Sequence, residues 1–223
     1  MRKPAQDKRF DAENSFNGLD DEEFETHARI KRYGNFTLTD AIVPSYDLKV
    51  TPKTGFRREF RRDGSGATPV LSISASREII FDLFLELARI VGELVDVVLE
   101  TSHHVKTGSS IRSHMDIHCD KMDIYVLLSL LCEFEELLVN DGCTGIAIVN
   151  RKAQIELQFD DHKLLYFFNW HAREEEIFAV LEKYGVPYDQ NMWLINEAEH
   201  VHQSSDKLIA QFQQLKLEIG ADR

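Results

Sequence analysis

The sequence predicts an α+β fold, and three features of its middle part lead to this prediction. Four short stretches alternate apolar and polar residues, as half-buried strands do. They are 70–75, 94–101, 113–119 and 144–149. Two amphipathic stretches with helical spacing, at 76–91 and 120–140, lie between them. The order of strand, helix and strand therefore occurs twice in succession.

The two units also match each other residue by residue. Laying Ile73 over Ile117 aligns Ser76 with Asp120, through either duplication or convergence on a good pattern. Two consecutive βαβ units predict a ferredoxin-like βαββαβ core, in which two helices cover one face of a mainly antiparallel sheet. Ser76 and Asp120 are the expected N-caps of these helices, and Gly92 is expected to end the first one.

Composition divides the chain into three parts. Residues 1–68 form an N-terminal extension that we expect to be partly disordered or an extended arm, with a Gly-rich linker at 63–68. Pro69 opens an α+β core domain at 69–190. Residues 191–223 are expected to form a C-terminal amphipathic helix.

Within the extension, basic and aromatic residues alternate at 53–62. Such a pattern can bind single-stranded nucleic acid by charge and stacking. We favour an intramolecular or solvated role, because the net charge of −12 opposes general attraction to phosphate. Nucleic acid is therefore an unexpected partner.

Beyond the repeat, residues 154–159 and 163–170 predict a β-hairpin that extends the sheet to five or six strands. A helix from 172 to 184 should end at Gly185. We expect the final helix to dock on its own domain or to mediate self-association through its apolar stripe.

Apolar residues make up 43% of the chain and charged residues 29%, and no apolar run is long enough to cross a bilayer. The first ten residues carry charge but no apolar core of a secretory signal. The three cysteines have no CxxC spacing, which favours buried reduced thiols. We therefore expect a cytoplasmic protein without a membrane partner.

The alternation of the strands gathers seven polar residues on the sheet face opposite the helices. They are Ser72, Ser74, Asp96, Glu100, His114, Asp116 and His118. Imidazole and carboxylate groups from His114, Asp116 and His118 would suit a divalent transition metal, with Asp96 or Glu100 reaching across from a paired strand. Ser72, Ser74, Asp96 and Glu100 are also candidates for a ligand site or an interface.

Two other interpretations of this face stay open. An uncovered sheet face is ordinarily polar, and the segment at 35–50 or a second subunit would also make these residues interfacial. The C-terminal histidines add no metal site under the helical prediction, because His200 and His202 would point to different faces of that helix.

No Walker loop, dinucleotide fingerprint or nucleophile elbow occurs in the sequence. The leading hypothesis is therefore a non-catalytic cytosolic binding or regulatory module that needs no cofactor and binds a protein partner or a small ligand. The alternative is a metal-dependent, hydrolase-like enzyme that uses the histidine and aspartate residues of the sheet face.

Overall fold

The protein has a mixed α+β fold built on one large sheet. The computed structural model describes residues 15–63, 66–103 and 115–220. Seven strands form the sheet in the order β4-β5-β10-β9-β8-β6-β7, and every neighbouring pair is antiparallel. These strands are β4 (Gly55–Asp63), β5 (Gly66–Ser74), β6 (Leu94–Thr101), β7 (Met115–Asp123), β8 (Thr144–Asn150), β9 (Ile155–Phe159) and β10 (Leu165–Phe168).

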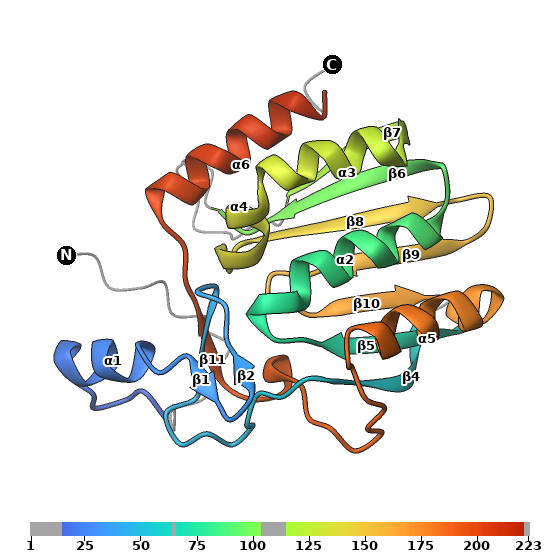
Figure 1. The fold of residues 1–223 in the computed structure, drawn as a ribbon. Helices are drawn as coiled ribbons and strands as arrows, with labels where there is room; N and C mark the ends of the chain where they lie inside the picture. Colours follow the sequence, from blue (N-terminus) through green and yellow to red (C-terminus); the bar gives the residue numbers. More distant parts are fainter. Residues whose placement is uncertain (1–14, 64–65, 104–114, 221–223) are drawn as a thin grey trace.

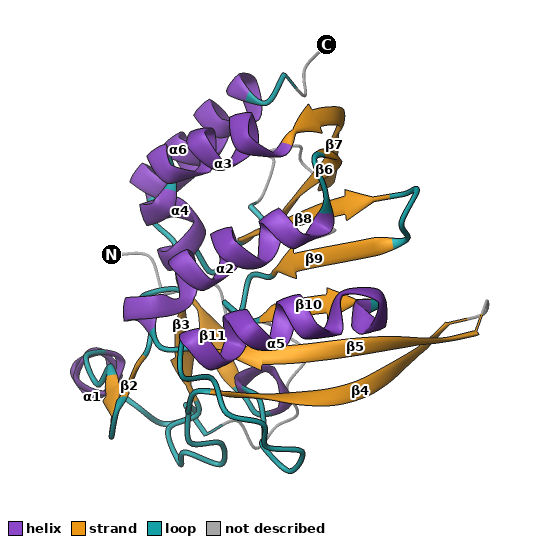
Figure 2. Cartoon of the chain, turned by 45° about the vertical axis from the view of Figure 1, so that its right-hand side comes forward, coloured by secondary structure: helices purple, strands orange, loops and turns teal. Residues whose placement is uncertain are grey.

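A layer of helices covers one face of this sheet, as Figures 1 and 2 show. The layer consists of α2 (Arg77–Val91), α3 (Ile124–Glu133), α4 (Glu135–Asn140) and α5 (Glu174–Lys183), with α6 (Asp206–Glu218) packed on α4. The apolar stripe of α2 supplies buried Leu83, Phe84 and Leu87 to the core between the two layers. Phe84 contacts Phe159 of β9, with 5.1 Å between the ring centroids. The expected N-cap at Ser76 and end at Gly92 are confirmed.

The ferredoxin-like arrangement is not confirmed. Strands β5 and β6, which α2 connects, are separated in the sheet by β10, β9 and β8. The expected C-terminal hairpin does form from β9 and β10, but it lies in the middle of the sheet and not at its edge. Alternation of residue types predicts which face a side chain occupies and leaves strand neighbours undetermined, so the sequence could not exclude this order.

The second helical segment also differs from the prediction. Strand β7 continues to Asp123, whose carboxylate accepts hydrogen bonds from Tyr125 N at 2.9 Å and Val126 N at 3.2 Å and so caps α3. Asp120, the expected cap, lies in β7 and pairs with Arg151. Phe134 then separates α3 from α4.

The basic stretch at 53–62 lies mostly within strand β4, where a linker or arm was expected. Arg57 forms an ion pair with Glu197 at 2.8 Å, and the guanidinium of Arg58 lies over the ring of Trp170 at 5.0 Å. These contacts are intramolecular, as the favoured interpretation expected. Of the residues predicted as a linker at 63–68, Asp63 lies in β4 and 66–68 lie in β5, which is paired with β4.

The first part of residues 191–223 is not helical. It contains the short 3-10 helix η2 (Ile195–Glu197) and strand β11 (His200–His202), and α6 begins only at Asp206 after the N-cap Ser205. Buried Leu208, Phe212 and Leu215 of α6 join the main core, so the stripe that could have mediated self-association packs on its own domain.

A smaller lobe lies beside the sheet at the left of Figure 1. It includes α1 (Asp21–Ala28), the β1–β2 hairpin (Arg32–Tyr33 and Phe36–Thr37) and β3 (Ile42–Pro44), which pairs with β11. Phe16, Val43 and Val201 pack together in its core. Strand β11 therefore joins the C-terminal segment to the N-terminal one.

No helix in residues 15–63, 66–103 and 115–220 is long and apolar enough to cross a membrane. All three cysteines are free thiols, as expected, but none is buried: Cys119 and Cys143 are partly exposed and Cys132 is exposed.

Candidate metal centre

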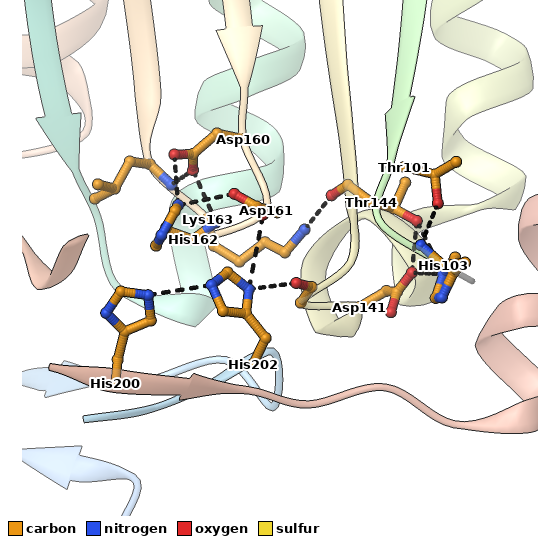
Figure 3. A network of polar contacts seen from close by, with 12 residues as sticks. Thr101, His103, Asp141, Thr144, Asp160, Asp161, His162, Lys163, His200 and His202 are labelled. Atoms are coloured by element: carbon orange, nitrogen blue, oxygen red, sulfur yellow. Dashed lines mark hydrogen bonds and ion pairs between the residues drawn. The ribbon is translucent and has the colours of Figure 1, made fainter. Parts of the chain in front are cut away.

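Strand β11 crosses the ends of the main strands, as Figure 3 shows. Its register is fixed on both sides, because Gln203 N donates to Ala41 O at 2.7 Å and Gly142 N donates to Gln203 O at 2.8 Å. Residues two apart on a strand project from the same face. His200 and His202 therefore both extend toward the sheet ends.

His162 approaches from the turn between β9 and β10. Asp160 shapes this turn, because its Oδ1 atom accepts hydrogen bonds from His162 N at 3.0 Å and Leu164 N at 2.8 Å. Lys163 adopts φ +61° within the turn and is buried. The tight turn places the imidazole of His162 opposite β11.

His162, His200 and His202 form a compact group, here called the three-histidine cluster. Their ring centroids lie 4.7 to 4.9 Å apart. One ring nitrogen from each lies within 4.8 Å of the others. The Nε2 atoms of His200 and His202 face each other at 3.1 Å.

The Nδ1 atoms of the cluster all face oxygen acceptors. His200 Nδ1 donates to Ala198 O at 2.7 Å, and His202 Nδ1 donates to Gly142 O. His162 Nδ1 lies 3.0 Å from Asp160 Oδ2 and 2.8 Å from Asp161 Oδ1. Because a carbonyl only accepts hydrogen bonds, the Nδ1 atoms of His200 and His202 carry the protons. In the neutral rings, the two facing Nε2 atoms then both carry lone pairs.

At neutral pH the cluster contains one charged ring, that of His162, and two neutral rings, those of His200 and His202. Burial, reinforced by the neighbouring His162 and His202, lowers the pKa of His200 to about 4. Burial and the charge of His162 also lower the pKa of His202. Burial also acts to lower the pKa of His162, but its hydrogen bonds with Asp160 and Asp161 outweigh this effect and raise the pKa to about 10. A metal ion would have to displace the proton of His162.

The geometry of the cluster suits a tetrahedrally coordinated cation such as Zn²⁺. With Zn–N bonds of about 2.05 Å, two nitrogens of one tetrahedral zinc lie about 3.3 Å apart. The two Nε2 atoms of His200 and His202 lie at 3.1 Å, close to this value. Histidines that bind a metal commonly donate their other ring proton to a carboxylate or a carbonyl, and all three histidines here have such an acceptor.

The structure separates the residues that the sequence had gathered on one face. Ser72 and Ser74 lie on β5, which three intervening strands separate from β6. Ser72 donates to Glu59, and Ser74 lines a small cavity beside His162. Asp96 accepts from Lys121 N at 2.9 Å and pairs with Arg151, so it fixes an irregularity between β6 and β7.

Two of the candidates do meet. Glu100 of β6 is the register partner of Asp116 of β7. Burial and the charge of Asp116 raise the pKa of the Glu100 carboxyl. His118 lies two residues further along β7 and is exposed, whereas His114 lies outside the described residues. Metal binding by His114, Asp116 and His118 stays a prediction.

The sequence prediction missed the three-histidine cluster for a local reason. Residues 191–223 were expected to form a C-terminal amphipathic helix, in which His200 and His202 diverge, whereas in a strand they share a face. The His-Val-His alternation was the available signal, but a three-residue strand is too short for its period to stand out. His162 was assigned only to a turn, and nothing in its neighbourhood predicts proximity to β11.

Comparisons with known proteins give no further assignment. No protein-family model, no curated protein and no solved structure matches this chain.

Proposed function

We propose that this protein binds a divalent transition-metal ion of the zinc type through His162, His200 and His202. The observation that carries this proposal is the 3.1 Å approach of the His200 and His202 Nε2 atoms while both Nδ1 atoms donate to carbonyls. Two facing lone pairs repel each other, and a cation between them would remove this repulsion because both Nε2 atoms would coordinate it. His162 supplies the third ligand from the opposite side.

The role that best fits this centre is regulatory and not catalytic. The three ligands come from β11 and from the β9–β10 turn, so the ion fastens the lobe that contains β3 and β11 to the sheet ends. A small cavity beside His162, with a volume of about 20 Å³, has room for a water molecule. The protein is accordingly a metal-dependent binding module whose lobe is held in place by the ion.

A hydrolase-like enzyme is the second candidate. Three imidazoles leave one position of a tetrahedral zinc for water, as in catalytic zinc sites. Turnover of ester or phosphoester substrates by zinc-loaded protein, lost in His200→Ala, would promote this candidate over the regulatory one.

Zinc titration of tag-free protein, followed by calorimetry, tests the binding proposal. We expect His162→Ala and His200→Ala each to weaken binding at this centre by at least tenfold, since each removes a ligand. His118→Ala is the matched control, because this exposed histidine of β7 belongs to the site that the sequence predicted. Loss of zinc binding in His118→Ala, with binding retained in His200→Ala, would transfer the site to β7 and refute the proposal.

A further inference from the structure

A second group of ligand-type side chains lies at the ends of β6 and β8. Thr101 and Thr144 are register partners, and Ser102 N donates to Cys143 O at 2.9 Å just beyond them. This pairing brings His103 beside Cys143. The neighbouring Asp141 completes the group, which we call the Asp141 cluster: His103, Asp141 and Cys143.

The carboxylate of Asp141 is completely buried. Its Oδ2 atom accepts from Thr144 Oγ1 at 2.5 Å and lies 2.6 Å from His103 Nε2. Burial opposes its ionisation, but the contacts with His103, Ser204 and Thr144 prevail and lower its pKa. The carboxylate is therefore a buried anion at neutral pH.

The other carboxylate oxygen has no equivalent partner. Asp141 Oδ1 is buried and forms no hydrogen bond with any described residue. A buried polar atom without a hydrogen bond destabilises the fold, and a bound cation would compensate for this loss. This observation is independent of the residue types that surround Asp141.

The donor set itself is typical of a transition-metal site. One ligand atom from each of His103, Asp141 and Cys143 lies within 4.8 Å of the others. Thiolate, imidazole and carboxylate together select zinc and similar borderline or soft ions over magnesium and calcium. Cys143 is only partly buried, and the ring of Phe212 on α6 covers His103 with 5.8 Å between centroids.

We propose that His103, Asp141 and Cys143 form a second, thiolate-containing site for a transition-metal ion. This site is separate from the three-histidine cluster. The ammonium of Lys163, which donates to Thr144 O at 2.8 Å, lies between the two groups in Figure 3. The two sites are linked through one turn, since Gly142 accepts the Nδ1 proton of His202.

Cobalt titration of the full chain tests this proposal, because a thiolate bound to Co²⁺ gives a charge-transfer band that imidazole ligands do not give. We expect the band in the wild-type protein and in His200→Ala, in which the first site is impaired. It should disappear in Cys143→Ser and persist in Cys132→Ser, the control at the exposed cysteine. A band that is absent from the wild type would overturn the proposal and leave His103 and Asp141 as a structural ion pair.

A second measurement needs no substitution. In the folded wild type, zinc should slow the alkylation of Cys143 on the order of tenfold or more, because a coordinated thiolate reacts poorly, and leave that of Cys132 unchanged. Equal rates with and without zinc at Cys143 would overturn the second site. The zinc titration of His200→Ala would separately show whether the three-histidine cluster binds.

Discussion

Asp161 is the residue through which the proposed metal centre can be tested with least disturbance. Its Oδ1 atom lies 2.8 Å from His162 Nδ1, so it orients the imidazole without being one of the three ligands. Asp160, in contrast, also accepts two backbone hydrogen bonds within the turn. A change at Asp161 should therefore affect metal affinity more than folding.

We expect Asp161→Asn to weaken zinc binding by about 10- to 100-fold, the usual effect of losing the carboxylate that orients a metal-binding histidine. Competition with a chromophoric chelator would measure the affinity. Asp116→Asn, at an exposed carboxylate of β7, should bind zinc as the wild type does. Equal affinities for Asp161→Asn and the wild type would argue against His162 as a ligand.

The buried carboxylate of Asp141 allows a stability prediction that does not depend on any metal. Asp141→Asn removes the charge that faces His103 at 2.6 Å, and breaking a buried pair costs about 3–5 kcal/mol. Urea unfolding of metal-free protein would measure the loss against Glu93→Gln, a change at an exposed carboxylate that should stay within about 0.5 kcal/mol of the wild type. A loss below about 1 kcal/mol would mean that the pair contributes no more than an exposed ion pair does.

At the scale of elements, the pairing of β6 with β7 places the carboxylates of Glu100 and Asp116 opposite each other. Burial and the charge of Asp116 raise the pKa of Glu100 in the folded protein. An acid with a raised folded pKa destabilises the fold once it ionises, and the penalty vanishes below the unfolded pKa, near 4.3. The contribution of Glu100 is thus unfavourable at neutral pH and absent in acid.

Glu100→Gln should therefore stabilise the protein at pH 7 by up to about 1 kcal/mol, the range for like charges on paired strands. The gain should fall as the pH drops through the raised pKa of Glu100 and be absent below about 4. Chemical unfolding over this pH range would measure it, with the exposed Glu93→Gln as control. A gain that persists in acid would show that repulsion from Asp116 is not its cause.

Much of the element content was predictable because periodicity records burial. The alternating burial of β6 and β9 and the apolar stripe of α2 follow the sequence pattern, whereas five consecutive residues of β5 and of β8 are buried. Strand order was not predictable, since pairing depends on long-range contacts that a residue pattern does not encode. For the same reason, the sequence placed all four residues Glu100, Asp116, Ser72 and Ser74 near one another. The structure brings Glu100 and Asp116 together but leaves Ser72 and Ser74 on a distant strand.

The candidate site was harder to predict than the fold. His162 and His200 are 38 positions apart in sequence, and their meeting depends on β11 crossing the strand ends. The expected helix over residues 191–223 left no place for the short strand on which that meeting depends. A site assembled from a turn and a three-residue strand leaves almost no periodic signal.

At the scale of the whole molecule, the proposed ion ties together segments from both ends of the chain. It would hold β11, and β3 paired with it, against the turn between β9 and β10. A ligand present at 100 times its Kd adds about 2.7 kcal/mol to any opening that releases it. The lobe should therefore open less often when zinc is bound.

Hydrogen exchange would detect this effect. We expect zinc at 100 times its Kd to slow amide exchange in β3 and β11 by about a hundredfold. Local exchange in α5, which lies on the side of the sheet away from β11 in Figure 1, should change little. Unchanged protection of β11 would mean that the lobe stays attached without the ion, and the regulatory role would fail.

The central claim, coordination by three imidazoles, is tested most directly by X-ray absorption spectroscopy of zinc-loaded protein. The Cys143→Ser variant with one equivalent of zinc should be measured, so that the thiolate site does not contribute. We expect three imidazole nitrogens at about 2.0 Å, with the outer-shell scattering of their rings. A shell made only of carboxylate and water oxygens would contradict the three-histidine cluster as the metal centre.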